Sequence, residues 1–375
     1  MVPSFCPNPG CNHHFDESDS YAGHWKHVGS YHTLVVGNVL RFKCLACGKG
    51  FSERTFSVDY YTKRLFDLRE IHRATSQGES VSSIARHLSG SIASIQNRAE
   101  RPSRNGLAMH ESLLADLQLS ENLVADGFES FDRSQYFPNN INLLVGQDSQ
   151  YLYGVTHTTI RRKGRMTRHQ KRMREKLEQK YRAPRKAIEA SFTRLLELIP
   201  RLWDRALVPR LRLLTDEHHA YPHSILHVQR LAEGQCDGSF SHWTWPSKAH
   251  RTIANPLFPV NYYDRELRKD IAVFRRESTC YTRNTANGLA RLMLHLVYHN
   301  YQKPFRVGSG RKTEEVHAEM AGIPAIRIAG QFTAFYTDRA FLSKQTLSVE
   351  GRKIWLKEAV TPLKAGATYL PKYAC

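Results

Sequence analysis

Two aspartates in apolar surroundings are the first candidates for chemistry in this sequence. The stretch LRLLTDEHHAYP (211–222) is an apolar run that ends at Asp216, and VADGFE (124–129) places Asp126 in a similar setting. Carboxylates bind hard cations such as Mg²⁺, and a pair of them can hold the metal ions of a phosphoryl-transfer site. An isolated Asp at a strand end is more often simply solvated. The elements that carry the two acids decide between these interpretations.

A series of short strands and helices is predicted around the two acids. Turn signals separate three predicted strands at 121–131, 139–146 and 151–160, and a fourth at 206–216 ends on Asp216. Apolar residues at helical spacing predict helices over 187–199, 261–278 and 287–302. We expect an α/β fold with a mixed sheet, flanking helices and the order β-β-β-α-β-α-β-α. If the first and fourth strands are neighbours, Asp126 and Asp216 converge. The segment 221–260 and the last residues of the chain give no clear assignment.

Four of the seven cysteines lie before residue 50, in the pairs CPNPGC (6–11) and CLACGKGF (44–51). Zn²⁺ takes four such ligands in a tetrahedron, and two tight Cys turns supply them. We therefore predict a structural zinc site made by Cys6, Cys11, Cys44 and Cys47. The wide spacing of the first pair leaves two alternatives open: His13 or His14 replaces one thiolate, or the four are unrelated reduced thiols.

Residues 59–105 have the pattern of a helix-turn-helix. Apolar spacing predicts a helix within 59–75, a second helix capped by Ser80, and a third after the turn at Ser89-Gly90. The third helix offers polar groups for base edges and phosphates: Ser91, Ser94, Gln96, Asn97, Arg98 and Arg101. Pro102, Asn105 and Gly106 predict a boundary before the next helix. A plain helical hairpin is the alternative.

The charge of the chain is concentrated in one segment. The formal net charge is +19 and the pI near 9.7, which favours a polyanionic partner such as double-stranded DNA. Residues 161–186 hold thirteen Lys or Arg and two Glu, more than half of the excess. From this basic segment we expect phosphate contacts by Arg161, Arg162, Lys163, Arg165, Arg168, Lys171 and Arg172. A solvated helix face is the alternative.

Other features bound the class of protein. The 375 residues predict two to four structural units. No apolar run is long enough to span a membrane, and the start MVPSFCPNPGC has no leader-like apolar segment, so we expect a cytoplasmic protein. Four histidines follow Asp216 without the spacing of a zinc hydrolase, and we interpret them as polar lining or DNA contacts: His218, His219, His223 and His227.

The order of these units resembles bacterial insertion-sequence transposases of the DDE type. The blocks VADGFE, LLTDEHHAYP, RKDIAVFRRESTCYTRN and LVYHNYQKPFRV carry the resemblance, which covers roughly residues 1–320. It implies a zinc ribbon (1–55), a helix-turn-helix domain (59–105), a ribonuclease H-like catalytic domain (110–305) and a C-terminal extension (306–375). It also implies that Asp126 and Asp216 hold Mg²⁺ or Mn²⁺ for DNA cleavage and strand transfer, in a homo-oligomer. That the protein is bacterial and nucleoid-associated is implied only by this resemblance.

The third metal-binding acid of these transposases has no clear counterpart here. The family places a Glu at the start of a helix with a basic residue seven positions later, and the best register puts Asn261 there, with Arg268 following. Asn261 is also a natural N-cap, with Asp264 at the third helical position. Glu277 is the other main candidate, and Asp264 and Glu266 are lesser ones.

Two other functions fit the same sequence. A sequence-specific DNA-binding regulator, or an inactive transposase relic, would bind DNA without metal-dependent cleavage. A structure-selective nuclease of the same fold would cut DNA without joining ends.

Overall fold

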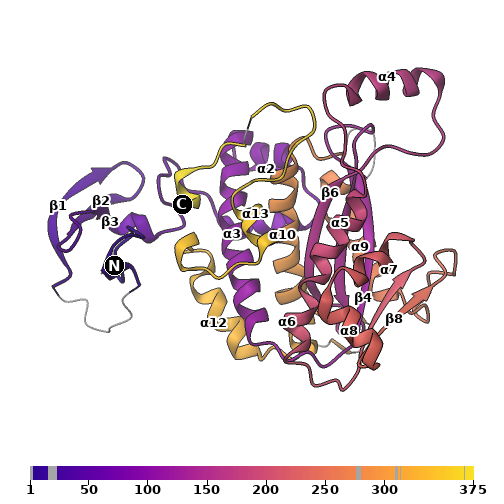
Figure 1. Ribbon diagram of the computed structural model, residues 1–375. Coiled ribbons are helices and arrows are strands. Elements are labelled where there is room, and N and C mark those ends of the chain that lie inside the picture. The colour runs from indigo at the N-terminus through magenta and orange to yellow at the C-terminus, as the bar shows by residue number, and fades with distance from the viewer. Residues whose placement is uncertain (1–2, 16–22, 276–279, 309–310, 313, 367) are drawn as a thin grey trace.

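The computed structural model describes residues 3–15, 23–275, 280–308, 311–312, 314–366 and 368–375. A small unit with a three-stranded sheet lies at one end, and helices with a five-stranded sheet form the larger body (Figure 1). The strands are β1 Trp25–Thr33, β2 Gly37–Cys44, β3 Gly50–Ser52, β4 Leu123–Phe131, β5 Pro138–Gly146, β6 Leu152–Thr159, β7 Leu211–Asp216, β8 Phe240–Trp245, β9 Val307–Gly308 and β10 Arg311–Lys312. The α-helices are α1 Leu68–Ser76, α2 Val81–His87, α3 Ile92–Ala115, α4 Arg168–Glu178, α5 Ala187–Leu196, α6 Ile199–Trp203, α7 Ala220–Leu226, α8 Gln229–Asp237, α9 Phe258–Asp270, α10 Thr285–Tyr301, α11 His317–Met320, α12 Ala325–Phe335 and α13 Val349–Trp355.

The five-stranded sheet is mixed, with the strand order β6-β5-β4-β7-β8. Strands β4, β5 and β6 form an antiparallel meander, and β7 and β8 run parallel to β4. The expected mixed sheet with flanking helices is therefore confirmed, including the adjacency of the first and fourth strands. The fifth strand, β8, falls inside the segment that the sequence left unassigned.

Helices cover both faces of this sheet. On one face α5 packs on β5 and β6, and Asn142 of β5 donates a hydrogen bond to Ser191 of α5 at 3.1 Å. On the other face α9 packs on β4 and β5, and the Arg268 guanidinium lies 4.6 Å from the centre of the Phe128 ring. Because side chains alternate along a strand, Asp126 projects to the same face as Phe128. The sequence thus directs Asp126 toward α9.

The long helix α3 runs beside α10 through the body (Figure 1). The expected boundary at Pro102, Asn105 and Gly106 is wrong, because α3 continues through all three. Gly106 serves a close approach of the two helices: a Cβ there would lie 2.5 Å from Val297 Cγ2. Asn105 donates a hydrogen bond to the carbonyl of Phe335 at 2.8 Å. These residues therefore join helices together and do not end one.

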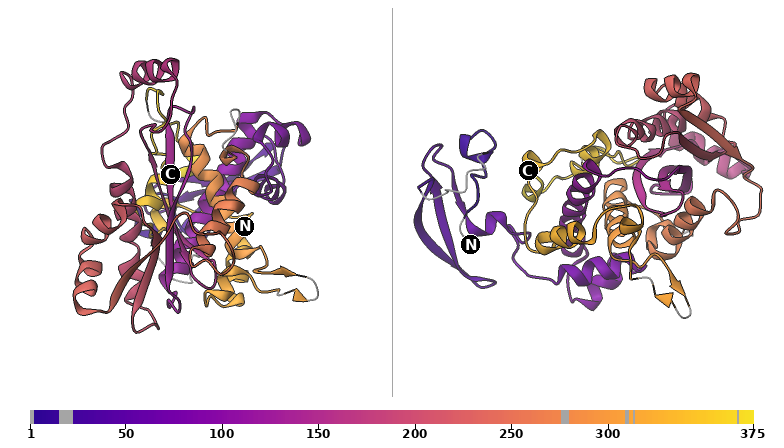
Figure 2. Two further views of the ribbon diagram at one scale, coloured as in Figure 1. Left: turned by 90° about the vertical axis from the view of Figure 1, so that its right-hand side faces the viewer. Right: turned by 90° about the horizontal axis from the view of Figure 1, so that it is seen from below.

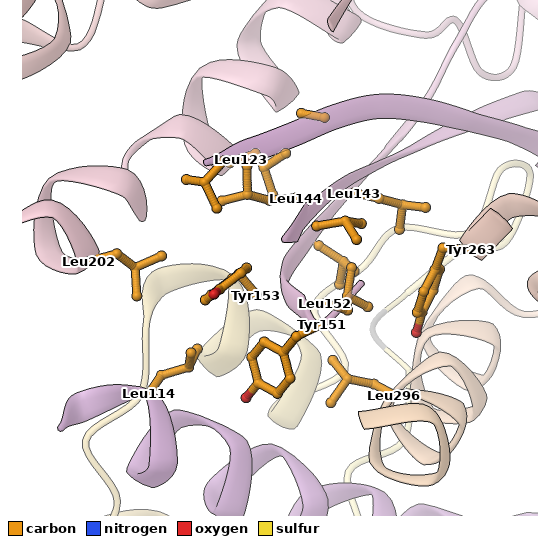
Figure 3. Close-up of a cluster of buried hydrophobic side chains, with 14 of the residues drawn as sticks. Leu114, Leu123, Leu143, Leu144, Tyr151, Leu152, Tyr153, Leu202, Tyr263 and Leu296 are labelled. Carbon is orange, nitrogen blue, oxygen red and sulfur yellow. The ribbon is translucent and has the colours of Figure 1, made fainter. Parts of the chain in front are cut away.

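The main core lies between the sheet and the pair α3 and α10 (Figure 3). Leucines from both layers meet there, together with buried tyrosines whose hydroxyls are paired: Tyr151 and Tyr301 share a hydrogen bond of 2.6 Å. Asn300 of α10 bonds both backbone groups of Leu152, at 2.9 and 3.0 Å. The free backbone groups at the first residue of the edge strand β6 are thereby paired. Across the described residues, no helix combines the length and the apolarity needed to cross a bilayer.

The C-terminal residues attach the small N-terminal unit to the body. Phe5 packs edge-on against Phe56 and Phe341, with ring centres 5.0 and 4.9 Å apart. The backbone of Arg339 donates to the carbonyl of Phe56 at 2.7 Å, and the His14 ring hydrogen-bonds Ser343 at 2.8 Å. The segment after residue 320, which the sequence left unplaced, thus connects the first residues of the chain to the helical body.

Candidate metal centre and nucleic-acid interface

The register of β4 and β7 brings Asp126 and Asp216 together. The two parallel strands pair Val124 with Leu214, so residues two positions further on lie side by side and on the same face. Burial raises the pKa of Asp126, and the negative charge of Asp216 raises it further, to about 6. The backbone N–H of His218 donates to Asp216 Oδ1 at 2.9 Å and fixes that carboxylate at the strand end.

A third carboxylate, Asp264, faces this pair from α9. Its Oδ1 is buried and has no hydrogen-bond partner among the described residues. Burial, and then the charge of Asp126, raise the pKa of Asp264 well above its ordinary value. Asp132 at the end of β4 is a useful contrast, because its buried carboxylate accepts hydrogen bonds of 2.9 Å from Asn139, His157 and Thr159. An unpaired buried carboxylate is costly unless a cation or proton joins it.

One tyrosine lies at the meeting point of the three acids. Tyr221 of α7 stacks on Phe192 with ring centres 4.0 Å apart, and its hydroxyl donates to Asp126 Oδ1 at 3.3 Å. Burial, and then the charges of Asp126, Asp216 and Asp264, raise the pKa of Tyr221 well above its ordinary value. Tyr221 therefore stays protonated and remains a hydrogen-bond donor to the site.

The three acids suit two metal ions, each bound by two of the carboxylates. Among the described residues, the N-terminal cysteines are the one group of three or more His, Cys, Asp or Glu side chains close enough to hold one ion together. Asp126 interacts with both other carboxylates, through the charges just described. In two-metal sites the ions lie about 3.5–4 Å apart, so one carboxylate can bind both of them. The donors are three carboxylates, and one oxygen of Asp264 has no hydrogen-bond partner among the described residues. Such hard oxygen donors fit Mg²⁺ or Mn²⁺ in this arrangement.

The sequence missed a cation in this site, Arg251. It lies in the exposed loop between β8 and α9, and its charge partly offsets the rise in the pKa values of Asp126 and Asp264. No local motif marks it, because only the return of the chain from β8 to α9 brings it to the acids. Asn255 holds this loop through hydrogen bonds of 2.8 Å to the His250 carbonyl and from the Leu257 N–H.

The other predicted third ligands have different positions. Asn261 lies on α9, three residues before Asp264, but the helix begins at Phe258, so the expected N-cap role of Asn261 is wrong. Glu266 is buried and forms ion pairs with Lys303 and, at 3.0 Å, with Lys269. It is thereby committed to a structural network. Glu277 lies outside the described residues.

We expect cation binding at this site to weaken in acid. Asp126 must lose its proton to bind a metal, and its pKa is about 6, so affinity falls about tenfold per pH unit below that value. The raised pKa has a second consequence: without metal, the folded state holds this proton more tightly than the unfolded chain, so unfolding becomes easier as pH rises from about 4 through 6. Mn²⁺ titrations of the wild type from pH 5 to 8 test the first expectation. Thermal unfolding without metal from pH 4 to 7 tests the second, and there the Asp126→Asn variant should show a flatter pH dependence.

The four N-terminal cysteines form a compact cluster, as predicted. Their sulfurs all lie within 4.8 Å of one another, and Cys6–Cys47 and Cys11–Cys44 are 3.6 and 3.7 Å apart. A zinc tetrahedron with bonds of about 2.3 Å requires sulfurs about 3.8 Å apart. The geometry thus fits structural zinc. The alternative with a histidine ligand is not supported: among the described residues the cluster contains neither His13 nor His14, and both ring nitrogens of His14 are hydrogen-bonded elsewhere.

The three helices predicted within residues 59–105 are present as α1, α2 and the start of α3, but the predicted DNA contacts change. Ser80 and Ser91 cap α2 and α3, as their side chains accept hydrogen bonds from the backbone. Arg98 and Arg101 are buried, which overturns the expectation that they face DNA.

The reason is tertiary packing against other parts of the chain. The Arg101 guanidinium lies 4.5 Å from the Tyr373 ring centre. Asn97 Oδ1 accepts hydrogen bonds from both buried arginines, and Gln96 accepts one from Arg291 at 2.7 Å. Of the predicted set, Ser91 and Ser94 remain at the accessible start of α3. Arg86 and His87 at the end of α2 are exposed beside them and were missed.

The basic segment projects from the body at the side of the metal centre. Helix α4 has no buried residue and stands away from the sheet (Figure 2). Arg161 is paired with Glu178 at 2.7 Å, and Arg162 is half-buried. The other five predicted phosphate ligands are exposed: Lys163, Arg165, Arg168, Lys171 and Arg172.

A cleft connects this segment with the end of β7. Its basic lining comprises Arg161, Arg162, Lys163, Arg182, Arg185 and Lys186, and His218 and His219 line it next to Asp216. Burial, and then the charges of His219 and Lys163, lower the pKa of His218, while the charge of Asp216 acts in the opposite direction. The predicted role of these two histidines as polar lining agrees with this position. His223 and His227 are exposed on and after α7, outside the lining of the cleft.

The edge of the sheet thus gathers three carboxylates, an arginine and a basic cleft. A scan against models of known protein families found no match for this sequence, and a search among curated proteins found no similar one.

Proposed function

We propose that this chain is a metal-dependent DNA transposase, which cleaves DNA at the ends of an insertion sequence and transfers the strands. The observation that carries the proposal is the convergence of Asp126, Asp216 and Asp264, with a basic cleft nearby whose lining includes His218, the residue that hydrogen-bonds Asp216. The strand order is compatible with the ribonuclease H-like fold that the resemblance implies. In this proposal the third acid is Asp264 in place of Asn261 or Glu277.

Each residue of the site has a part in this chemistry. Bound Mg²⁺ or Mn²⁺ would supply the charge that activates an attacking oxygen and stabilises the leaving one. Asp126 interacts with both other acids and would be the ligand common to the bound ions, while the Tyr221 hydroxyl keeps its carboxylate in place. Arg251 offers a cation to the phosphate that the acids alone would repel.

The remaining units suit the binding of DNA ends. The zinc unit, the start of α3 and the exposed Arg86 and His87 provide surfaces for duplex DNA, and the basic segment 161–186 holds the phosphate backbone near the acids. Two ends must be cut together for transposition, so the working form is a homo-oligomer.

A cleavage and joining assay tests the proposal. Zinc-loaded protein is incubated with Mg²⁺ or Mn²⁺, a supercoiled plasmid, and a short duplex that carries the DNA flanking the gene. Covalent joining of the duplex to the plasmid is the expected result. Cleavage without joining would instead assign a nuclease, and tight binding without cleavage would assign a regulator or an inactive relic.

We expect the basic segment to set the salt dependence of DNA binding. Replacing Lys163 and Arg165 with Gln removes up to two cations that neutralise phosphates, so the slope of log K against log salt falls by about 0.9 for each of these cations. The matched control replaces Arg201 and Arg210, which are also exposed but lie away from the acids, since Arg210 directly precedes the opposite end of β7. Equal slopes for both variants would remove the segment from the DNA interface.

A further inference from the structure

Two exposed tryptophans stand beside the metal centre. Trp243 and Trp245 lie on the edge strand β8, with exposed fractions of 52% and 38%. The parallel pairing of β7 and β8 sets Trp243 next to Leu214 and Trp245 next to Asp216. Paired residues on neighbouring strands project to the same face. The second indole therefore lies directly beside a proposed metal ligand, on the face that carries the acids.

One cation contacts this pair of indoles, and two more follow in the next loop. The Arg212 guanidinium lies 3.6 Å from the centre of the Trp243 ring, and the following loop carries exposed Lys248 and Arg251. The strand itself, FSHWTW, has no acidic residue. Aromatic rings interleaved with cations are the combination that binds unpaired nucleotides, because bases stack on the rings while the cations contact phosphates. An apolar protein partner would not require this charge.

We infer that Trp243 and Trp245 form a stacking platform for an unpaired base of the DNA strand next to the reacting phosphate. In an intact duplex both faces of each base are covered by neighbouring bases, so the platform can act only where the strands are opened. The inference rests on the proposed function and narrows its substrate: DNA with unpaired nucleotides at the point of cleavage binds better than continuous duplex.

The test compares two DNAs in Ca²⁺ buffer, which prevents turnover. One is a continuous duplex, and the other has the same sequence with a short mismatched bubble containing 2-aminopurine. Wild type should bind the bubble about tenfold more tightly than the duplex and quench the 2-aminopurine fluorescence, as stacking does. Trp245→Ala should lose most of this preference, whereas Trp245→Phe should keep much of it.

Controls separate this inference from the proposed function. Tyr369→Ala removes an aromatic side chain that is 76% exposed elsewhere and should bind like wild type. Equal binding of both DNAs by wild type, with cleavage and joining intact, would overturn the platform alone. Failure to bind either DNA would overturn the proposed function as well. A change in sedimentation of Trp243→Ala/Trp245→Ala without any change in DNA preference would show that these rings contact a second copy of the chain.

Discussion

Replacing Asp264 with Asn abolishes metal-dependent cleavage and joining, while replacing Asn261 with Ala leaves most of the activity. The physical reason is charge: Asp264 presents a buried carboxylate oxygen without a hydrogen-bond partner among the described residues, and the negative charge of Asp126 acts on it. A neutral amide in its place is a much weaker ligand for a hard cation. We expect a loss on the order of 10³-fold in rate, typical of removing a group that stabilises transition-state charge.

The control variants identify the third acid without ambiguity. Asp216→Asn should be equally inactive, and Asn261→Ala and Glu277→Ala should remain within about tenfold of wild type. DNA binding and thermal unfolding are measured for each variant, so that a loss of fold is not mistaken for a loss of chemistry. An inactive Asn261→Ala protein beside an active Asp264→Asn protein would reverse the assignment.

The second large effect concerns zinc. We expect one Zn²⁺ per chain, and we expect Cys44→Ser to lose it and to unfold the N-terminal unit. Structural zinc contributes about 10–16 kcal/mol to the folding of small zinc domains, and the buried apolar cluster around Cys6, Cys11 and Cys44 is small. The apolar packing alone therefore cannot keep this unit folded once the metal is lost.

Metal content and limited proteolysis measure this effect. The N-terminal unit of Cys44→Ser should become sensitive to protease, while the helical body with its large core stays resistant. Cys236→Ser is the matched control, because Cys236 is an exposed free thiol far from the cluster in the sequence. Full zinc content in Cys44→Ser would contradict the four-cysteine site.

Much of the larger body could be predicted from patterns that are local in the sequence. Apolar runs bounded by turns gave β4 to β7, and the adjacency of β4 and β7 followed from the fold class, so Asp126 and Asp216 were paired correctly. The cysteine cluster could also be predicted, because the two closely spaced cysteine pairs are a local pattern. By contrast, β8 is short, and Phe240 is its one buried residue. No alternation of buried apolar and exposed polar residues therefore marked it as a strand.

The errors share one physical cause, which is contact between distant parts of the chain. Arg98 and Arg101 read as surface residues because of their charge, but Tyr373 and the backbone near Val58 bury Arg101. Gly106 reads as a helix breaker, yet its missing side chain is what lets α3 approach α10. Asp264 ranked low because only the packing of α9 on β4 shows that it faces Asp126.

The position of Mn²⁺ in crystals of the zinc-loaded protein, located by anomalous scattering, tests the central claim most directly. We predict one ion between Asp126 and Asp216 and a second between Asp126 and Asp264, about 3.5–4 Å apart. Crystals of Asp126→Asn should lose both. Saturating Mn²⁺ that leaves these carboxylates without an ion, in crystals with the same fold, would contradict the account.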